Sequence, residues 1–329
     1  MNIFLTGASG FVGSHLAKSL SAAGHEVLCH FRTPQATNIE PHPNLTIWSG
    51  NLNDVDSLSK RLLGFDTAIH CAAEMKLWNS EKALLETNVL MTQHVLEAAR
   101  KAGIKQFIYM SDASIAKNPL DQNLNVAESR ALPLLKNFPY SHSKSEAERL
   151  VLDAGNEMLR TISLRPASIW GKGDVVDRSL GRAADLNKFG WFDQGDYPFS
   201  TCYIRNLCEA VKKALLSDAN QASFFISDGP PMHFRQWMSM RLKAGHYKVP
   251  TLSIPRFFAK PLARFTENGW KYLPLRGEPP LIREMVHLVA HPFTVSIQRA
   301  KEQLGYEPLY AIEAGMLEIE GCRSLRGLP

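Results

Sequence analysis

Several features that mark specialised classes of protein are scarce or missing in this sequence. The 329 residues include only five cysteines, an odd number at wide spacings with no Cys-x-x-Cys pair. We therefore expect no disulfide framework and no zinc or other metal site, and we expect Cys29 and Cys71 to be buried in apolar runs. No apolar run reaches the roughly 18 residues that a membrane-spanning helix needs. Lysine and arginine form no basic cluster, so nucleic acid is not an expected partner.

The start of the sequence also lacks the marks of a secretory leader. Residues 1–5 contain no basic segment and no cleavage site and pass directly into a strand-like run. We therefore expect no signal peptide and a cytoplasmic location. What is present is an ordinary globular composition, with 45% hydrophobic and 21% charged residues and a formal net charge of +5. This length predicts about two domains, or one large α/β domain with an attached lobe.

The first half of the chain alternates short apolar runs with longer helical patterns. Strands are expected at 2–6, 26–31, 45–49, 67–72, 106–111 and 161–164. Helices are expected at 11–23, 81–102 and 140–153, with Gly24 and Gly103 just beyond the ends of the first two. This alternation predicts βαβ units and an α/β fold with a parallel, doubly wound sheet over residues 1–165.

Beyond residue 165 the pattern becomes irregular. A helix is expected at 206–216 and a strand at 224–227, and the remainder consists of helical segments separated by prolines. We predict a smaller, mostly helical C-terminal lobe over 166–329 that shapes a substrate pocket, with residues 200–228 returning to the sheet.

Aromatic residues gather in this lobe. One group could line an apolar pocket or form a core under a long loop, and it slightly favours an apolar substrate; its members are Trp170, Trp191, Phe192, Tyr197 and Phe199. A second group forms a helix-like stripe over 254–273, which we expect to be core or lid, with contact to a membrane surface as the alternative. Its members are Phe257, Phe258, Phe265 and Trp270.

The strongest local motif is Thr-Gly-Ala-Ser-Gly-Phe-Val-Gly at 6–13, which follows a strand and opens a helix. Gly7 permits a tight turn, Gly10 lets the backbone approach a pyrophosphate, and Gly13 allows the helix to pack close to the sheet. The helix N-terminus offers free N–H groups and the positive end of its dipole to phosphates. The motif predicts dinucleotide binding by Gly7, Ser9, Gly10, Phe11, Val12 and Gly13.

The end of the second strand bears on the choice of dinucleotide. An acidic residue there would bind the ribose 2′-hydroxyl of NAD, but the run is Cys-His-Phe-Arg at 29–32. Arg32 can pair with a 2′-phosphate through its planar, multi-donor head. We therefore favour NADP(H), with NAD(H) as the alternative, and expect His30 to be a packing residue.

Tyr140 and Lys144, in the run Tyr-Ser-His-Ser-Lys, would share one face of a helix. A free tyrosine has a pKa near 10, about three units too high for a base at neutral pH. A nearby ammonium favours the phenolate, so the pair predicts a tyrosine that exchanges the proton accompanying hydride transfer. Lys144 would also hold the nicotinamide ribose.

Together these motifs resemble an extended short-chain dehydrogenase/reductase, of the NAD(P)-dependent epimerase/dehydratase superfamily, over nearly the whole chain. Further matching runs are 50–52, 70–73, 107–111 and 164–171, and the helix that bears Asn88. Within the superfamily the chain is most similar to the 3β-hydroxysteroid dehydrogenase-like branch, because of the runs 139–144 and 225–229.

The resemblance implies roles for further residues. Asn51 and Leu52 would flank the adenine, and Asn88 would brace the helix beside the active site. The cofactor cleft would be lined by Cys71, Ala72 and Ala73, and the nicotinamide by Pro166, Ala167, Ser168 and Ile169. Fold relatives often pair through two long helices, which implies a homodimer formed by 81–102 and 140–153.

One position departs from the family pattern. The family has Ser or Thr after the fifth strand, whereas Asp112 follows Ser111 here. An ionised carboxylate only accepts hydrogen bonds, and close to Tyr140 it would raise the pKa of the phenol. Asp112 could orient an alcohol or relay a proton, could point away while Ser111 or Ser114 supplies the hydroxyl, or could impair catalysis. We favour the second of these; a turn-forming aspartate is the simplest alternative. Arg205 also stands where the family has an acidic residue.

The leading functional hypothesis is an NADP(H)-dependent oxidoreductase. It would move a hydride to or from a hydroxyl or carbonyl carbon of a small, hydrophobic, steroid- or terpenoid-like substrate. The first alternative is a nucleotide-sugar epimerase or dehydratase, since Arg178 and Arg182 could bind a diphosphate. The second alternative is a non-catalytic, NADP-binding regulator, for which Asp112 is the argument.

Overall fold

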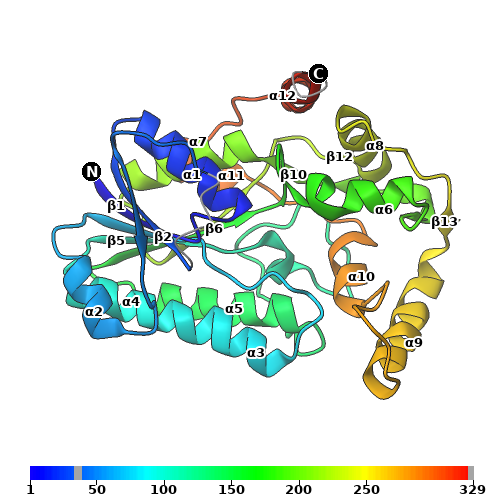
Figure 1. Cartoon of the computed structure of the whole chain (residues 1–329), viewed down its shortest axis with the longest axis horizontal. Helices are drawn as coiled ribbons and strands as arrows, with labels where there is room; N and C mark the ends of the chain where they lie inside the picture. Colours follow the sequence, from blue (N-terminus) through cyan, green and yellow to red (C-terminus); the bar gives the residue numbers. More distant parts are fainter. Residues whose placement is uncertain (33–38, 325–329) are drawn as a thin grey trace.

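The computed structural model describes residues 1–32 and 39–324, and its centre is a seven-stranded sheet (Figure 1). The strand order is β11-β6-β5-β4-β1-β2-β3, and every pair of neighbours is parallel. The strands are β1 Asn2–Thr6, β2 Glu26–Phe31, β3 Leu45–Ser49, β4 Thr67–His70, β5 Gln106–Met110, β6 Arg160–Pro166 and β11 Ala222–Ile226. The predicted doubly wound parallel sheet is confirmed.

Helices cover both faces of the sheet (Figure 1). One face carries α1 Phe11–Ala22, α7 Ile204–Leu216 and α11 Gln298–Leu304; the other carries α2 Val55–Arg61, α4 Met91–Lys101 and α5 Pro139–Asp153. Each strand feeds both layers, because successive side chains point to opposite faces. In β1, Ile3 and Leu5 join the α1 and α7 core, whereas Phe4 joins the core under α2, α4 and α5.

Two predicted elements differ in detail. The strand expected at 67–72 ends at His70, because the Gly7 turn lies against it: a Cβ on Gly7 would be 2.7 Å from the Ala72 nitrogen. The helix expected at 81–102 is α3 Glu81–Leu85 and α4, joined by a π-helical turn at Glu86–Leu90. Such π turns insert an extra residue and often occur at functional sites. The helix α2 was not predicted.

The C-terminal lobe is mostly helical, as predicted. Its helices are α6 Gly181–Asp185, α8 Phe234–Ala244, α9 Ala259–Tyr272, α10 Arg283–Val289 and α12 Ile312–Ser324. Three short ribbons add β7 Ser168–Trp170 with β10 Thr201–Tyr203, β8 Trp191–Phe192 with β13 Ser253–Ile254, and β9 Pro198–Phe199 with β12 Met232–His233. The chain returns from the lobe to the sheet at β11, which pairs with β6.

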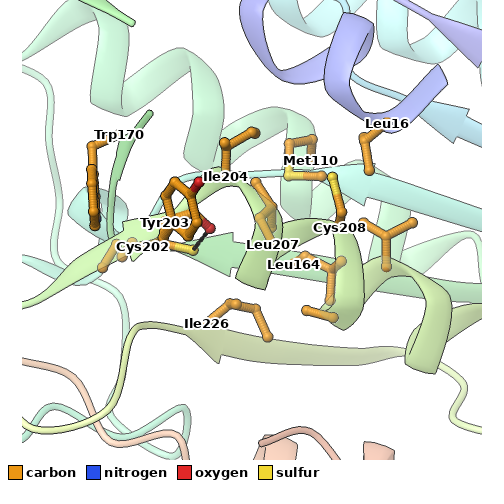
Figure 2. Close-up of a cluster of buried hydrophobic side chains, with 14 of the residues drawn as sticks. Leu16, Met110, Leu164, Trp170, Cys202, Tyr203, Ile204, Leu207, Cys208 and Ile226 are labelled. Atoms are coloured by element: carbon orange, nitrogen blue, oxygen red, sulfur yellow. Dashed lines mark hydrogen bonds between the residues drawn. The ribbon is translucent and has the colours of Figure 1, made fainter. Parts of the chain in front are cut away.

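The lobe and the α1 face of the sheet share one hydrophobic core. Figure 2 shows Trp170 and Tyr203 of the lobe in the same hydrophobic cluster as Leu207 of α7 and Ile226 of β11. The Trp170 and Tyr203 rings lie 4.6 Å apart between centroids. Asp228 fastens this junction, because its carboxylate accepts hydrogen bonds from the Trp170 indole, the Thr201 hydroxyl, the Tyr203 nitrogen and the Asn206 amide.

The first group of lobe aromatics, which we predicted as pocket lining or core, is therefore mostly core. Trp170, Trp191, Tyr197 and Phe199 are all buried, and Phe192 is partly exposed. The slight preference for an apolar substrate that we drew from them has no support in their positions. The stripe at 254–273 differs in the opposite sense: Phe257, Phe258 and Phe265 are exposed, so the expectation of a core position is wrong for them.

Candidate active site

The glycine motif forms an open cradle between β1 and α1. Gly7 has a φ of +68°, and a Cβ on Gly13 would come within 2.2 Å of the Gly7 oxygen. A Cβ on Gly10 would have only that oxygen nearby, at 3.3 Å, so the space above Gly10 is open. Within the described residues no side chain caps α1, and its first turn carries no acid. The free N–H groups and the open space fit a dinucleotide pyrophosphate.

The other cofactor-binding candidates lie at the carboxyl ends of the strands, beside this cradle. Arg32 follows β2 and is exposed, Asn51 and Leu52 follow β3, Cys71–Ala73 follow β4, and Ala167 follows β6. Ser9, Phe11, Val12, Ser168 and Ile169 are all partly exposed, whereas Pro166, Ala167 and Leu52 are buried. In open α/β sheets ligands bind at this edge, so their predicted roles remain geometrically consistent predictions.

Several residues around the cradle are structural. His30 is buried, donates its Nε2–H to the Gly50 carbonyl at 2.8 Å and packs on Trp48, which confirms its packing role. Cys29 is buried, but Cys71 is partly exposed beyond the end of β4, so its predicted burial is wrong. The four cysteines whose side chains are described have free thiols; Cys322 lies outside that set.

Tyr140 is the centre of the candidate site. It lies in the first turn of α5, it is only 2% exposed, and its phenol donates to the Asp112 Oδ2 atom at 3.2 Å. The exposed Met75 sulfur also lies 3.2 Å from the phenol oxygen. Burial, and then the charge of Asp112, raise the pKa of Tyr140 well above its ordinary value. The proton therefore stays on the phenol at neutral pH.

Lys144 occupies the expected face of α5 but does not lower the pKa of Tyr140. Its ammonium donates to the Met110 carbonyl at 2.6 Å and lies 4.3 Å from the centroid of the Tyr109 ring. Because the side chain is only 3% exposed, burial lowers the pKa of Lys144 to about 8. The expectation that this ammonium makes Tyr140 more acidic is thus wrong, since burial and Asp112 hold the pKa of the phenol above its ordinary value.

Asp112 points toward Tyr140, not away from it as we favoured. Its second oxygen accepts the Ser114 N–H at 2.8 Å and so caps the short 3₁₀ turn Ala113–Ala116. Asp112 therefore forms the turn and faces the phenol at the same time, and its role toward an alcohol or in a proton relay stays a prediction. The hydroxyl oxygens of Ser111 and Ser114 are buried and have no hydrogen-bond partner in the described chain, so the structure leaves both free to bond a ligand.

Two side chains, Asn88 and Glu284, hold α5 in place; the sequence predicted the first and not the second. Asn88, in the π turn, donates to the Ser143 hydroxyl at 2.9 Å and accepts from the Glu74 nitrogen at 2.7 Å, which is the bracing role expected. Glu284 of α10 accepts from the backbone nitrogens of Tyr140 and Ser141, both at 3.2 Å. It also accepts from the Ser141 hydroxyl at 2.6 Å.

No sequence signal pointed to Glu284. It lies 144 residues after Tyr140, in a lobe without a motif. An anion at a helix N-terminus is stabilising, and here it fixes the turn that carries the phenol. Met75 was missed for a related reason, because it lies in an irregular segment between β4 and α3. Arg205, the other departure from the family pattern, pairs with Glu318 at 3.0 Å and stacks on Tyr310, which is a structural role.

The described residues contain no helix that is both long and apolar enough to cross a bilayer. They also contain no group of three His, Cys, Asp or Glu side chains that could hold a metal ion.

Comparison with solved structures supports the fold. A UDP-glucose 4-epimerase of Thermotoga maritima, solved with UDP-glucose, covers 99% of this chain and 100% of its own with a TM-score of 0.76. Its sequence is 20% identical, a level at which the likeness concerns the fold alone.

Comparison with characterised sequences reaches further. A farnesyl-dihydroquinoline-oxide ketoreductase of Stigmatella aurantiaca is 30% identical over 93% of this chain and 92% of its own. A 2-alkyl-3-oxoalkanoate reductase of Stenotrophomonas maltophilia is 31% identical over 97% of this chain and 98% of its own length. A 3β-hydroxysteroid dehydrogenase/Δ5→4-isomerase of Mycobacterium tuberculosis is 29% identical over 96% of this chain and 88% of its own length.

The match to a family model settles the classification. The model of the NAD dependent epimerase/dehydratase family matches residues 3–226, from the first strand of the sheet to the last. The chain is thus an NAD(P)-dependent enzyme of the NAD-dependent epimerase/dehydratase family, an extended short-chain dehydrogenase/reductase with 3β-hydroxysteroid dehydrogenases among its relatives.

Proposed function

We propose that this enzyme is an NADP(H)-dependent oxidoreductase that interconverts a carbonyl and a hydroxyl group on a small, apolar substrate. The observation that carries the proposal is the Tyr140 phenol, which is buried at the carboxyl edge of the sheet and hydrogen-bonded to Asp112 at 3.2 Å. The same edge carries the open glycine cradle. Two of the relatives are named as reductases, which also supports an oxidoreductase that acts on a carbonyl group.

The chemistry follows from the protonation state of the phenol. The nicotinamide supplies a hydride when the reduced cofactor is bound. Tyr140, which keeps its proton at neutral pH, donates that proton to the substrate oxygen. Asp112 would repel an alkoxide, so the oxygen has to be protonated as its charge develops. At neutral pH the phenol is thus in the protonated state that ketone reduction needs, whereas alcohol oxidation needs the phenolate as base.

Lys144 and the two free serine hydroxyls complete the assignment. An ammonium has three donors, and only one is used by the Met110 carbonyl, so we assign the others to the nicotinamide ribose. Ser111 and Ser114 have buried hydroxyls without partners among the described residues, and we assign one of them to the substrate oxygen. The role that the family gives to one Ser or Thr would then be divided between a serine and Asp112.

Arg32 is the basis for proposing NADP(H). It directly follows β2 and is exposed, and no acidic residue occupies the end of that strand. A carboxylate there would repel a 2′-phosphate, whereas a guanidinium binds it through paired hydrogen bonds.

Two exposed arginines, Arg178 in the turn before α6 and Arg182 in α6, favour a second candidate. This is a nucleotide-sugar epimerase or dehydratase, because a diphosphate needs cations. Co-purification of tightly held oxidised cofactor, with no net turnover of ketones, would support this candidate over the first.

The test is ketone-dependent NADPH oxidation over a panel of apolar ketones. Tyr140→Phe is expected to lower kcat/KM by about a thousandfold, the usual range for loss of a general acid, with NADPH affinity nearly unchanged. Tyr306→Phe is the matched control, because this buried tyrosine bonds the Ser227 carbonyl at 2.9 Å, away from the cradle. Full activity in Tyr140→Phe would remove the phenol from the mechanism.

A further inference from the structure

The helix α9 and the 3₁₀ turn Arg256–Phe258 before it lie at the edge of the lobe, next to α10 (Figure 1). The fully buried side chains of α9 are small: Ala259 and Ala263 pack with Val286 and Ala290 of α10. Trp270 is partly exposed, with its indole nitrogen buried. Polar side chains fix the same side, since Thr266 bonds the Leu281 carbonyl. The buried face of α9 thus offers few large apolar groups.

The large apolar side chains of this segment point outward instead. Phe257 is 71% exposed, Phe258 53%, Phe265 77% and Tyr272 71%. Leu262, Leu273 and Leu275 are exposed as well. A helix of a water-soluble domain normally turns its apolar stripe toward the core. Scattered exposed apolar residues need no explanation, but a contiguous patch of this kind marks an interaction surface. We call these seven residues the α9 face.

The charges around the α9 face are mostly positive. The segment 256–278 contains five basic and two acidic residues. The two acids are already paired, Glu267 with Arg283 at 2.6 Å and Glu278 with Lys76 at 3.3 Å. Four of the bases have no carboxylate partner within the part of the chain that the structure describes: Lys260, Arg264, Lys271 and Arg276. An anionic surface would complement them.

We propose that the α9 face docks this enzyme onto the surface of an anionic lipid bilayer. A helix with aromatic and leucine side chains on one side and lysine and arginine beside them binds in the plane of the interface. Anionic headgroups attract such bases. The cores of protein–protein interfaces, by contrast, are depleted in charge and in lysine, so the mixture of free bases and aromatics favours a membrane over a second protein.

A cavity of about 970 Å³ lies behind the α9 face. Lys260, Pro261 and Arg264 of α9 form part of its wall, and Leu124 and Phe138 form another part. Phe138 directly precedes α5, which carries Tyr140. Docking by α9 would thus place this cavity, whose wall also carries basic side chains such as Lys117 and Arg283, next to the bilayer surface. The docking does not depend on the proposed function.

The test is sedimentation of the full-length enzyme, saturated with NADPH, with two kinds of vesicle. One kind is phosphatidylcholine alone, and the other contains phosphatidylglycerol as well. We expect binding to the anionic vesicles that weakens as salt is added. Phe257→Ser with Phe265→Ser should lower vesicle affinity at least about tenfold, and Lys260→Gln and Lys271→Gln about fivefold each.

Two exposed apolar residues elsewhere provide matched controls. Leu63 is 65% exposed and Met158 71%, and serine at either position should leave vesicle binding unchanged. Equal loss in these controls, or absence of binding to anionic vesicles, overturns the proposal. So does a dimer in light scattering that dissociates in the double phenylalanine variant without any vesicle binding, because the face would then be a protein interface.

The same variants separate this proposal from the proposed function. Ketone reduction in detergent solution does not need a bilayer. An enzyme that reduces ketones but ignores vesicles contradicts only the docking, and one that binds vesicles but reduces no ketone contradicts only the function.

Discussion

Replacing Asp112 by asparagine tests the electrostatic feature that sets this site apart from its family. Asparagine keeps the oxygen that accepts the Ser114 N–H at 2.8 Å, and it is a good capping residue. The 3₁₀ turn after β5 should therefore survive. What disappears is the negative charge that faces the Tyr140 phenol.

The magnitude follows from the geometry. The Tyr140 oxygen and the Asp112 Oδ2 atom are 3.2 Å apart. At an effective dielectric constant of about 20, two unit negative charges at that separation repel by about 5 kcal/mol, which is an upper bound for the effect on the phenolate. Burial raises the pKa of Tyr140 first and Asp112 second, so the variant should have a lower phenol pKa without reaching that of a free tyrosine.

Two assays measure the change. The phenolate absorbance of the Asp112→Asn variant is titrated against that of a Tyr140→Phe, Asp112→Asn double variant, so that the other tyrosines cancel. Alcohol oxidation with NADP⁺ is followed over pH in parallel. Because oxidation needs the phenolate as base, its rate at pH 8 should rise at least about tenfold in Asp112→Asn. Asp112→Glu, which keeps the charge, is the control.

A phenol midpoint that is the same in wild type and Asp112→Asn would refute the reasoning. It would mean that the carboxylate does not face the phenol in solution. A fall in oxidation rate with the expected lower midpoint would instead show that Asp112 takes part in proton relay, and the repulsion argument would stand.

Three further predictions concern the cofactor, the catalytic helix and acid stability. Arg32→Ala should weaken NADPH binding about tenfold or more, equivalent to 1.4 kcal/mol, with little effect on NADH, as measured by calorimetry. Glu284→Gln should lower the free energy of unfolding by about 2 kcal/mol in urea titrations, because three hydrogen bonds to a charged acceptor are weakened. Burial lowers the pKa of His70 and of His287 to about 3 from 6.5. The unfolded chain alone then takes up these protons below pH 6.5, so stability is full above that pH and falls toward pH 3, by at most about 3 kcal/mol per pH unit.

Each of these has a plain contrary result. Equal losses of NADPH and NADH affinity would remove the 2′-phosphate role of Arg32. Unchanged stability and kcat in Glu284→Gln would show that α5 does not depend on its anionic cap. A free energy of unfolding that stays constant between pH 7 and pH 5 would contradict neutral, buried imidazoles.

The sheet could be predicted because its signals are local. The apolar runs, the glycine motif and the Tyr–Lys spacing each lie within a short segment, and βαβ units leave few topologies open. The π turn at Glu86–Leu90 could not be predicted, because it depends on how Asn88 reaches Glu74 and Ser143. The stripe at 254–273 shows another limit: periodicity identifies an apolar side of a helix but not whether that side meets protein.

The candidate site likewise combines features that a local sequence signal predicts with features that depend on distant residues. Tyr140 and Lys144 share a helix face as expected, but their electrostatics depend on Met110 and Asp112, which come from another element. The spacing of two residues along a helix fixes the positions of their Cβ atoms. It does not fix the positions of the charged or polar ends of the side chains, which depend on residues of other elements. Glu284 is the clearest case, since a contact across 144 residues leaves no trace in a single sequence.

The position of Glu284 gives α10 an influence on catalysis that reaches past its own bonds. One side of α10 supports α9, and its first turn holds the carboxylate to which the start of α5 is tied. A shift of α10 along its axis would move the Glu284 carboxylate and, with it, the start of α5. The distance between the Tyr140 phenol and Asp112 would then change. A substitution on the outer rim of the lobe that displaces α10 would therefore alter proton transfer, although the substituted residue touches none of the reacting atoms.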